Sequence, residues 1–168
     1  MYHTFGTKTG FDLWVLPLEG ERKQAPFLQT EFDEVLGQFS PDGKWIAYAS
    51  NETGRYEVYV RSFPSSGGKW QMSTGGGSRP RWCKDGKELC YLAPNRKLMA
   101  VDVKTASAVL EAGQPKELFQ TSAADLPEWM GVYDVTADGK RFLIISAQQE
   151  STASPITVVQ NWTAGLKK

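Results

Sequence analysis

Few residues in this chain of 168 amino acids could carry out chemistry on a substrate. His3 is the only histidine, and no G-x-S-x-G sequence is present to supply the nucleophile of a Ser-His-Asp triad. Because there is no second imidazole and the acidic residues are scattered, the sequence shows no metal-ligand pattern. The glycine-rich stretches 65–69 and 75–78 do not lead into a helix that could hold a phosphate. We therefore expect no catalytic residue, no metal and no cofactor.

The two cysteines, Cys83 and Cys90, flank one Asp-Gly turn. If the turn covers residues 84–86, Cys83 lies opposite Lys87. The alternation of side chains along a strand then places the two thiols on opposite faces of the sheet. That arrangement does not permit a disulfide, and the spacing lacks the second ligand pair of a structural zinc site. We predict two free thiols that pack as small side chains.

The element that must position any functional side chain is a repeated hairpin. The sequence Asp-Gly-Lys occurs three times, with its aspartates at Asp42, Asp85 and Asp138, at intervals of 43 and 53 residues. Glycine adopts the positive φ that a tight hairpin requires, and aspartate tolerates the neighbouring turn position. The motif is therefore interpreted as a turn between a first and a second strand, and not as a catalytic signature.

The runs around these turns keep the same order in each repeat. An apolar run follows each Asp-Gly pair, a run rich in β-branched and aromatic residues comes next, and a shorter fourth run closes the complete units. Repeats of this length with four strands are typical of propeller blades. We predict an all-β fold with little helix, namely a β-propeller of about three and a half four-stranded blades in a single domain or fragment. The predicted blades are 1–30 (partial), 31–74, 75–121 and 122–168 (partial).

Two connections and two open ends complete this prediction. The stretch 104–114 is predicted as a lengthened loop between a third and a fourth strand, with a helical turn as the alternative, and 121–130 is predicted as a second extended connection. Because the first and last blades are incomplete, unpaired strand edges are expected. These edges favour a homo-oligomer, in which two chains approximate one ring, or indicate excision from a longer protein.

The motifs also carry a resemblance to a known family. The unit Ser-Pro-Asp-Gly-Lys, followed by "YEVYV", resembles the WD-like propeller repeats of the TolB type, most specifically at 39–63 and 79–103. The stretches "YEVYVRSFP" and "VVQNWTAGLKK" are similar to the C-terminal propellers of bacterial eukaryotic-like serine/threonine kinases. This resemblance implies a sensor-like binding module in a periplasmic or extracytoplasmic location. The kinase motifs themselves are absent from the sequence.

The resemblance also implies where a ligand would bind. Propellers place ligands at one end of the channel, near the loops that enter the first strands and the loops between the second and third strands. On this chain the sign of charge in those loops alternates from blade to blade, with Glu31, Asp33 and Glu34, then Arg79 and Arg81, then Asp125, Glu128, Trp129 and Tyr133, together with Asn51, Glu52 and Arg55. The candidate ligand-binding residues are Arg79, Arg81, Glu34, Glu128, Trp129 and Tyr133. The arginines are the strongest candidates because a guanidinium binds carboxylate or phosphate bidentately. The alternative is that the charges bridge adjacent blades.

Composition narrows the choice of partner. The formal net charge is zero and no Lys/Arg run exceeds two residues, so nucleic acid is not an expected partner. No stretch approaches the ~20 apolar residues of a membrane span, so no membrane contact is expected. We predict a non-catalytic interaction module for a protein or a small polar ligand. The alternatives are a glycan lyase or hydrolase using Glu34 and Glu128, and a structural half-propeller that assembles with itself.

Overall fold

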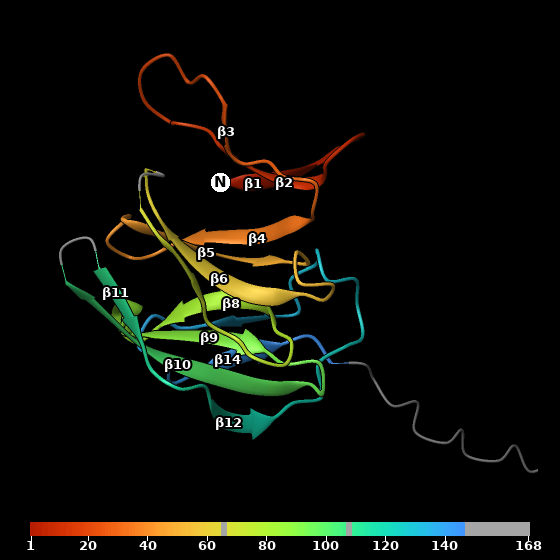
Figure 1. Cartoon of the computed structure of the whole chain (residues 1–168). Helices are drawn as coiled ribbons and strands as arrows, with labels where there is room; N and C mark the ends of the chain where they lie inside the picture. Colours follow the sequence, from red (N-terminus) through yellow and green to blue (C-terminus); the bar gives the residue numbers. More distant parts are fainter. Residues whose placement is uncertain (65–66, 107–108, 147–168) are drawn as a thin grey trace, which may run out of the picture.

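The computed structural model describes residues 1–64, 67–106 and 109–146, in which nearly all of the regular secondary structure is β-strand (Figure 1). The strands in these residues are β1 (Tyr2–Gly6), β2 (Gly10–Val15), β3 (Ala25–Leu28), β4 (Glu34–Phe39), β5 (Trp45–Ser50), β6 (Glu57–Ser62), β7 (Lys69–Gln71), β8 (Ser78–Cys83), β9 (Glu88–Leu92), β10 (Lys97–Ala106), β11 (Val109–Ala112), β12 (Lys116–Gln120), β13 (Tyr133–Val135) and β14 (Phe142–Ile144). One 3-10 turn, η1 (Lys84–Gly86), joins β8 to β9. In this part of the chain, no helix is long and apolar enough to cross a membrane.

The strands form antiparallel sheets that follow one another along the chain. The first sheet is β1-β2-β3, the second is the meander β4-β5-β6-β7, and the last described sheet is β13-β14. The third sheet runs β8-β9-β10, and the outer edge of the long strand β10 carries both β11 and β12. Figure 1 shows the first three sheets in chain order, from the red N-terminal sheet through the orange and yellow second sheet to the green third sheet. This order of stacked antiparallel meanders is that of a partial β-propeller, and the predicted all-β fold class is confirmed.

The Asp-Gly turns occupy equivalent corners of successive sheets. Gly43, Gly86 and Gly139 each join the first to the second strand of a sheet, and each has a positive φ, at 70°, 85° and 70°. The turns also contact one another. A Cβ added to Gly86 would lie 3.1 Å from Pro41 Cδ, and one added to Gly139 would lie 2.9 Å from Lys84 Cγ. The turns therefore pack side by side at the same end of neighbouring sheets.

Two of the three turns have the same pattern of hydrogen bonds, each within its own turn. The Ser40 hydroxyl donates to Asp42 Oδ1 at 2.5 Å and accepts from the Trp45 backbone N–H at 3.0 Å. The Thr136 hydroxyl likewise donates to Asp138 at 2.5 Å and accepts a backbone N–H at 3.2 Å. Cys83 stands at this position in the middle turn, where no such hydroxyl exists. That turn has a different form, because Lys84 and Asp85 both have positive φ.

The prediction of two free thiols is wrong, since Cys83 and Cys90 form a disulfide. The turn is one residue longer than expected, so Cys83 pairs with Glu88 and Cys90 pairs with Arg81. A one-residue change in register moves a side chain to the other face of a sheet. Both cysteines therefore lie on one face, with Cα atoms 6.2 Å apart, within the range that a disulfide spans.

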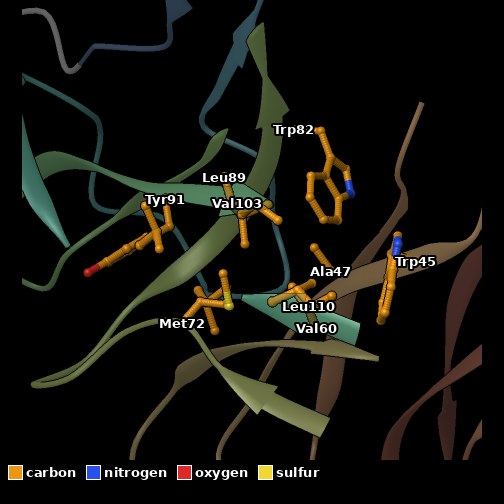
Figure 2. Packing of buried hydrophobic residues seen from close by; sticks show 11 residues of the cluster. Trp45, Ala47, Val60, Met72, Trp82, Leu89, Tyr91, Val103 and Leu110 are labelled. Atoms are coloured by element: carbon orange, nitrogen blue, oxygen red, sulfur yellow. The ribbon is translucent and has the colours of Figure 1, made fainter. Parts of the chain in front are cut away.

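Apolar clusters lie between successive sheets. Figure 2 shows buried side chains of the second and third sheets converging, among them Trp45, Ala47, Val60 and Met72 on one side and Trp82, Leu89, Tyr91, Val103 and Leu110 on the other. Leu13 of the first sheet packs on Tyr48 of the second in the same way. Leu98 of the third sheet packs on Val132 and Tyr133 at the fourth. Because the second and third sheets are covered on both faces, their strands are rich in consecutive apolar residues.

The stretch 104–114, predicted as a lengthened loop, forms a β-hairpin instead. The end of β10 pairs with β11, with Val103 opposite Ala112 and Thr105 opposite Leu110. β-branched residues such as Val103 and Thr105 favour an extended chain. Leu110 is buried in the cluster between the second and third sheets. Burial of this side chain explains why the connection folds back as a strand.

Candidate functional site

A pocket of about 300 Å³ lies where the loops of three sheets meet. Arg55 and Tyr56 reach it from the loop between β5 and β6, Arg79 reaches it from β8, and Arg96 reaches it from the loop between β9 and β10. Asp125 and Glu128 belong to the connection that enters β13. The structure therefore brings together entry loops and second-to-third-strand loops, the two kinds of loop that the sequence predicts at a ligand-binding end. The role of this pocket in binding stays a prediction.

Arg79 forms one wall of the pocket, and its guanidinium is fully engaged. Nε donates to the Met130 carbonyl at 2.9 Å, and Nη2 donates to the carbonyls of Leu126 and Pro127 at 2.6 and 3.2 Å. Nη1 donates to the Ser78 hydroxyl at 3.0 Å and to Glu128 at 2.7 Å. All five N–H groups of this buried side chain thus bind the chain itself.

A β-bulge explains how Arg79 reaches that loop. The pairing of β8 with β9 shifts register between Ser78 and Arg81, and Arg79 has a φ of 58°. The second sheet has the same irregularity, where Leu36 has a φ of 55°. A bulge bends the strand and re-aims its side chains. Sequence reasoning identified Arg79 but not the bulge, so it missed that the guanidinium turns toward the neighbouring connection.

Arg55 and Arg96 differ from Arg79 because they keep donors that are not used within the described residues. Arg55 donates only through Nε, to Glu57 at 2.8 Å, and its side chain is largely exposed. Arg96 has a single ion pair, 3.8 Å from Nη2 to the exposed Asp125. Both guanidinium groups stand at the pocket and can bind an anionic group bidentately. Arg96 was not among the ligand-binding residues predicted from the sequence. The signal that could have found it was its place just after Pro-Asn, in a loop between a second and a third strand.

Tyr56 links the pocket to the junction of the first two sheets. Its hydroxyl donates to Asp33 at 3.0 Å, and burial together with this acceptor raises the pKa of Tyr56. Asp33 also accepts from the Phe11 backbone N–H at 3.0 Å and from the Asn51 amide at 3.1 Å. One carboxylate thus joins residues of the first and second sheets.

Glu34 lies apart from the pocket, at the junction of the first and second sheets. It is buried, and the Thr30 hydroxyl donates to its Oε1 while Oε2 has no hydrogen-bond partner. Burial raises the pKa of Glu34 to about 7, and the nearby Asp12 contributes to the rise. Asp12 is itself buried and was missed by sequence reasoning, although an aspartate within an apolar strand was a signal.

Arg81 and Tyr133 meet at another place, between the third and fourth sheets. The Arg81 guanidinium lies 5.8 Å from the centroid of the Tyr133 ring, and its Nε lies 3.5 Å from Asp134. The Tyr133 hydroxyl is buried without a hydrogen-bond partner, and burial raises the pKa of Tyr133. The ion pairs of Arg79 and Arg81 follow the alternative in which charges bridge adjacent sheets.

Trp129 is half-exposed. It lies in the connection that enters the fourth sheet and contacts the first sheet. Its ring lies 6.0 Å from that of Phe11, which also contacts Phe5 and His3 edge to face. His3 therefore packs in an aromatic cluster, and burial lowers the pKa of His3. The six candidate residues thus fall into three surroundings: Arg79 and Glu128 at the pocket, Arg81 and Tyr133 at the junction of the third and fourth sheets, and Glu34 and Trp129 against the first sheet.

The stacked meanders, the repeated turns and a pocket at the loop end define a β-propeller type of fold. No family model matches the sequence, and no curated protein does. Among solved structures, the chain is similar to TolB from Acinetobacter baumannii, with 16% sequence identity and a TM-score of 0.49. The match covers 82% of this chain and 43% of the TolB chain, so this chain spans less than half the length of that protein.

Proposed function

We propose that this chain is a non-catalytic binding module, with the pocket between the loops as its recognition site. The observation that carries the proposal is the placement of Arg55 and Arg96 on that pocket with donors not used inside the described chain. A ligand with a carboxylate or phosphate group matches these two guanidinium groups. The ligand class is therefore a small polar anion or the acidic side chain of a protein.

The experiment measures binding of citrate and inorganic phosphate by thermal shift and by calorimetry. Binding to the native state raises the apparent Tm by mass action. The double variant Arg55→Gln/Arg96→Gln should lose the shift, because both bidentate donors are gone. Lys44→Gln, an exposed cation at the far end of β5, is the control and should keep it. Equal shifts in the double variant and the control would contradict the proposal.

A finer proposal concerns the parent protein. The sequence resemblance at "YEVYVRSFP" and "VVQNWTAGLKK" favours the sensor portion of a larger bacterial receptor kinase, in a periplasmic or extracytoplasmic location. Reading the coding sequence that flanks this chain tests it. A kinase domain followed by one membrane span upstream is the expected result, and an unrelated upstream domain would contradict it.

The enzyme alternative gains no support from the carboxylates proposed for it. Glu34 is buried against Thr30 and Asp12, whereas Glu128 pairs with Arg79 at the pocket. A glycosidase needs its two carboxyl groups on either side of one bond. Release of reducing sugar from polysaccharide substrates by the purified chain, abolished in Glu128→Gln, would favour the enzyme over the binding module.

A further inference from the structure

Every junction between successive sheets uses the same two faces. We call the face that packs on the next sheet along the chain the forward face, and the opposite face the backward face. In the second sheet, Ala47 lies on the forward face, in the cluster shared with the third sheet (Figure 2). Tyr48, its neighbour in β5, lies on the backward face in the cluster shared with the first sheet. Their exposed fractions are 0% and 1%, because both faces are covered.

Within the described part of the chain, no sheet packs on the forward face of the last sheet, β13-β14. Leu143 in β14 stands where Ala47 stands in β5, since Leu143 pairs with Asp134 as Ala47 pairs with Gln38 at the same distance from the turn glycine. Leu143 is nevertheless 75% exposed, and Ile145 on the same face is 53% exposed. Large apolar side chains at positions that are buried in the interior sheets mark a surface that a partner covers.

In the described residues, no other sheet covers the backward face of the first sheet. Tyr2 in β1 pairs with Trp14 in β2, as Tyr48 in β5 pairs with Tyr59 in β6. A tyrosine thus recurs at this position, but Tyr2 is 39% exposed while Tyr48 is 1% exposed. In the described part of the chain, no apolar cluster includes Tyr2 or Trp14. Among the described residues, no sheet packs on this face as the first sheet packs on its counterpart in the second.

We propose that the forward face of the last sheet of one copy packs on the backward face of the first sheet of a second copy. The chain already forms this kind of junction between its own sheets, so it carries both halves of a contact that its repeat makes complementary. The two faces differ, so the contact is heterologous, and such contacts form rings when the rotation closes. For the chain by itself, the occupant that carries the matching face is another copy of this chain.

Two copies suit closure better than three. Propellers close with about four to eight blades, and each copy supplies four sheets in the described residues. Two copies joined twice, each forward face on the other's backward face, give a ring of eight. This ring is independent of the ligand pocket, whose lining residues all come from one copy.

The oligomeric state of the purified chain tests the proposal. Light scattering on a sizing column should give a dimer at about 100 μM, where association with a micromolar Kd is nearly complete. Leu143→Glu/Ile145→Glu should give a monomer, and so should Tyr2→Glu. Val109→Glu, which changes a residue that is 58% exposed on the β10–β11 hairpin, is the matched control and should stay dimeric. Far-ultraviolet circular dichroism checks that each variant is folded.

A mixing experiment distinguishes this contact from pairing of like surfaces. The Leu143→Glu/Ile145→Glu variant keeps its backward face, and the Tyr2→Glu variant keeps its forward face. Mixed together, the two monomeric variants should form a one-to-one complex through the single intact junction. A monomeric wild type, dimers that survive the face substitutions, or a mixture that stays monomeric would overturn the proposal. Open assemblies larger than a dimer would overturn closure by two copies.

Discussion

The guanidinium of Arg79 and the carboxylate of Glu128 lie 2.7 Å apart across the junction between the third sheet and the connection to the fourth, although the residues are 49 positions apart in the sequence. The remaining donors of Arg79 bind the Ser78 hydroxyl and backbone carbonyls of the same connection. Arg79 therefore holds a wall of the candidate pocket in place, while Arg55 and Arg96 are the groups available to the proposed ligand.

Replacing Arg79 should destabilise the fold strongly. Arg79→Met keeps the length of the side chain but leaves buried acceptors without donors, and we expect a loss of about 3 kcal/mol in the free energy of unfolding. Arg81→Met removes a weaker 3.5 Å pair with an exposed Asp134, so a loss below about 1 kcal/mol is expected. Urea unfolding of the two variants checks the difference. Similar losses of unfolding free energy in both variants would show that the hydrogen bonds of Arg79 do not stabilise this connection more than the Arg81 pair does.

Glu34 should make stability fall as the pH rises. Burial raises the pKa of Glu34 from its usual value to about 7, so the folded protein binds this proton more tightly than the unfolded chain. Stability from this group is complete below the unfolded pKa, declines between about pH 4.5 and 7, and is absent above that window. Glu34→Gln should remove the decline and be more stable than wild type at pH 8, on the order of 2 kcal/mol.

The measurement compares urea unfolding of wild type and Glu34→Gln at pH 5, 7 and 8. The difference between the two proteins isolates Glu34 from groups whose pKa is lowered, such as Asp42, where the Ser40 hydroxyl donates to the carboxylate. A difference that does not change with pH would show that Glu34 is ionised in the folded protein throughout this range.

The hydroxyl of Ser40 should be replaceable by threonine but not by alanine. Ser40 is buried, and its hydroxyl both donates to Asp42 and accepts from the Trp45 backbone N–H. Ser40→Ala should cost about 1 to 2 kcal/mol because a buried N–H loses its acceptor. Ser40→Thr should stay close to wild type, since Thr136 makes the same bonds in the last turn. Thermal unfolding followed by circular dichroism measures both.

The disulfide between Cys83 and Cys90 should be present and stabilising. Thiol titration of the denatured protein without reductant should find no free thiol, and titration after reduction should find both. Because the cross-link closes a short loop, the double variant Cys83→Ala/Cys90→Ala should lose about 2 kcal/mol of stability. Two free thiols in the unreduced protein would restore the sequence-based prediction.

The repeated motif predicted the fold better than it predicted the candidate site. The turn glycines and the order of apolar runs predicted the strands, because a hairpin with a positive-φ corner is a local property of the chain. The hydrogen-bond partners of Arg79 and the pairing of Cys83 depend on a bulge and on one extra turn residue. Such irregularities shift a strand by one position, and no pattern of apolar residues records them.

The burial of Glu34 also lay beyond sequence reasoning, and for Asp12 the only signal was an aspartate within an apolar strand. Both belong to strands, where a charged residue is usually assigned to the exposed face, yet both are buried at a sheet junction. Their surroundings come from Thr30 and Gln29 at the end of another strand. A pattern along one strand does not show which side chains from a neighbouring strand end will meet it.

Arg79 binds the connection that enters β13 mainly through the carbonyls of Leu126, Pro127 and Met130. Because main-chain oxygen is common to every amino acid, the path of this loop does not depend on the identity of most of its side chains. Selection could therefore diversify an exposed residue such as Asp125 without loss of shape, as it does in the variable loops of antibodies. The same property recommends this segment as a place for library design, with the arginine kept constant.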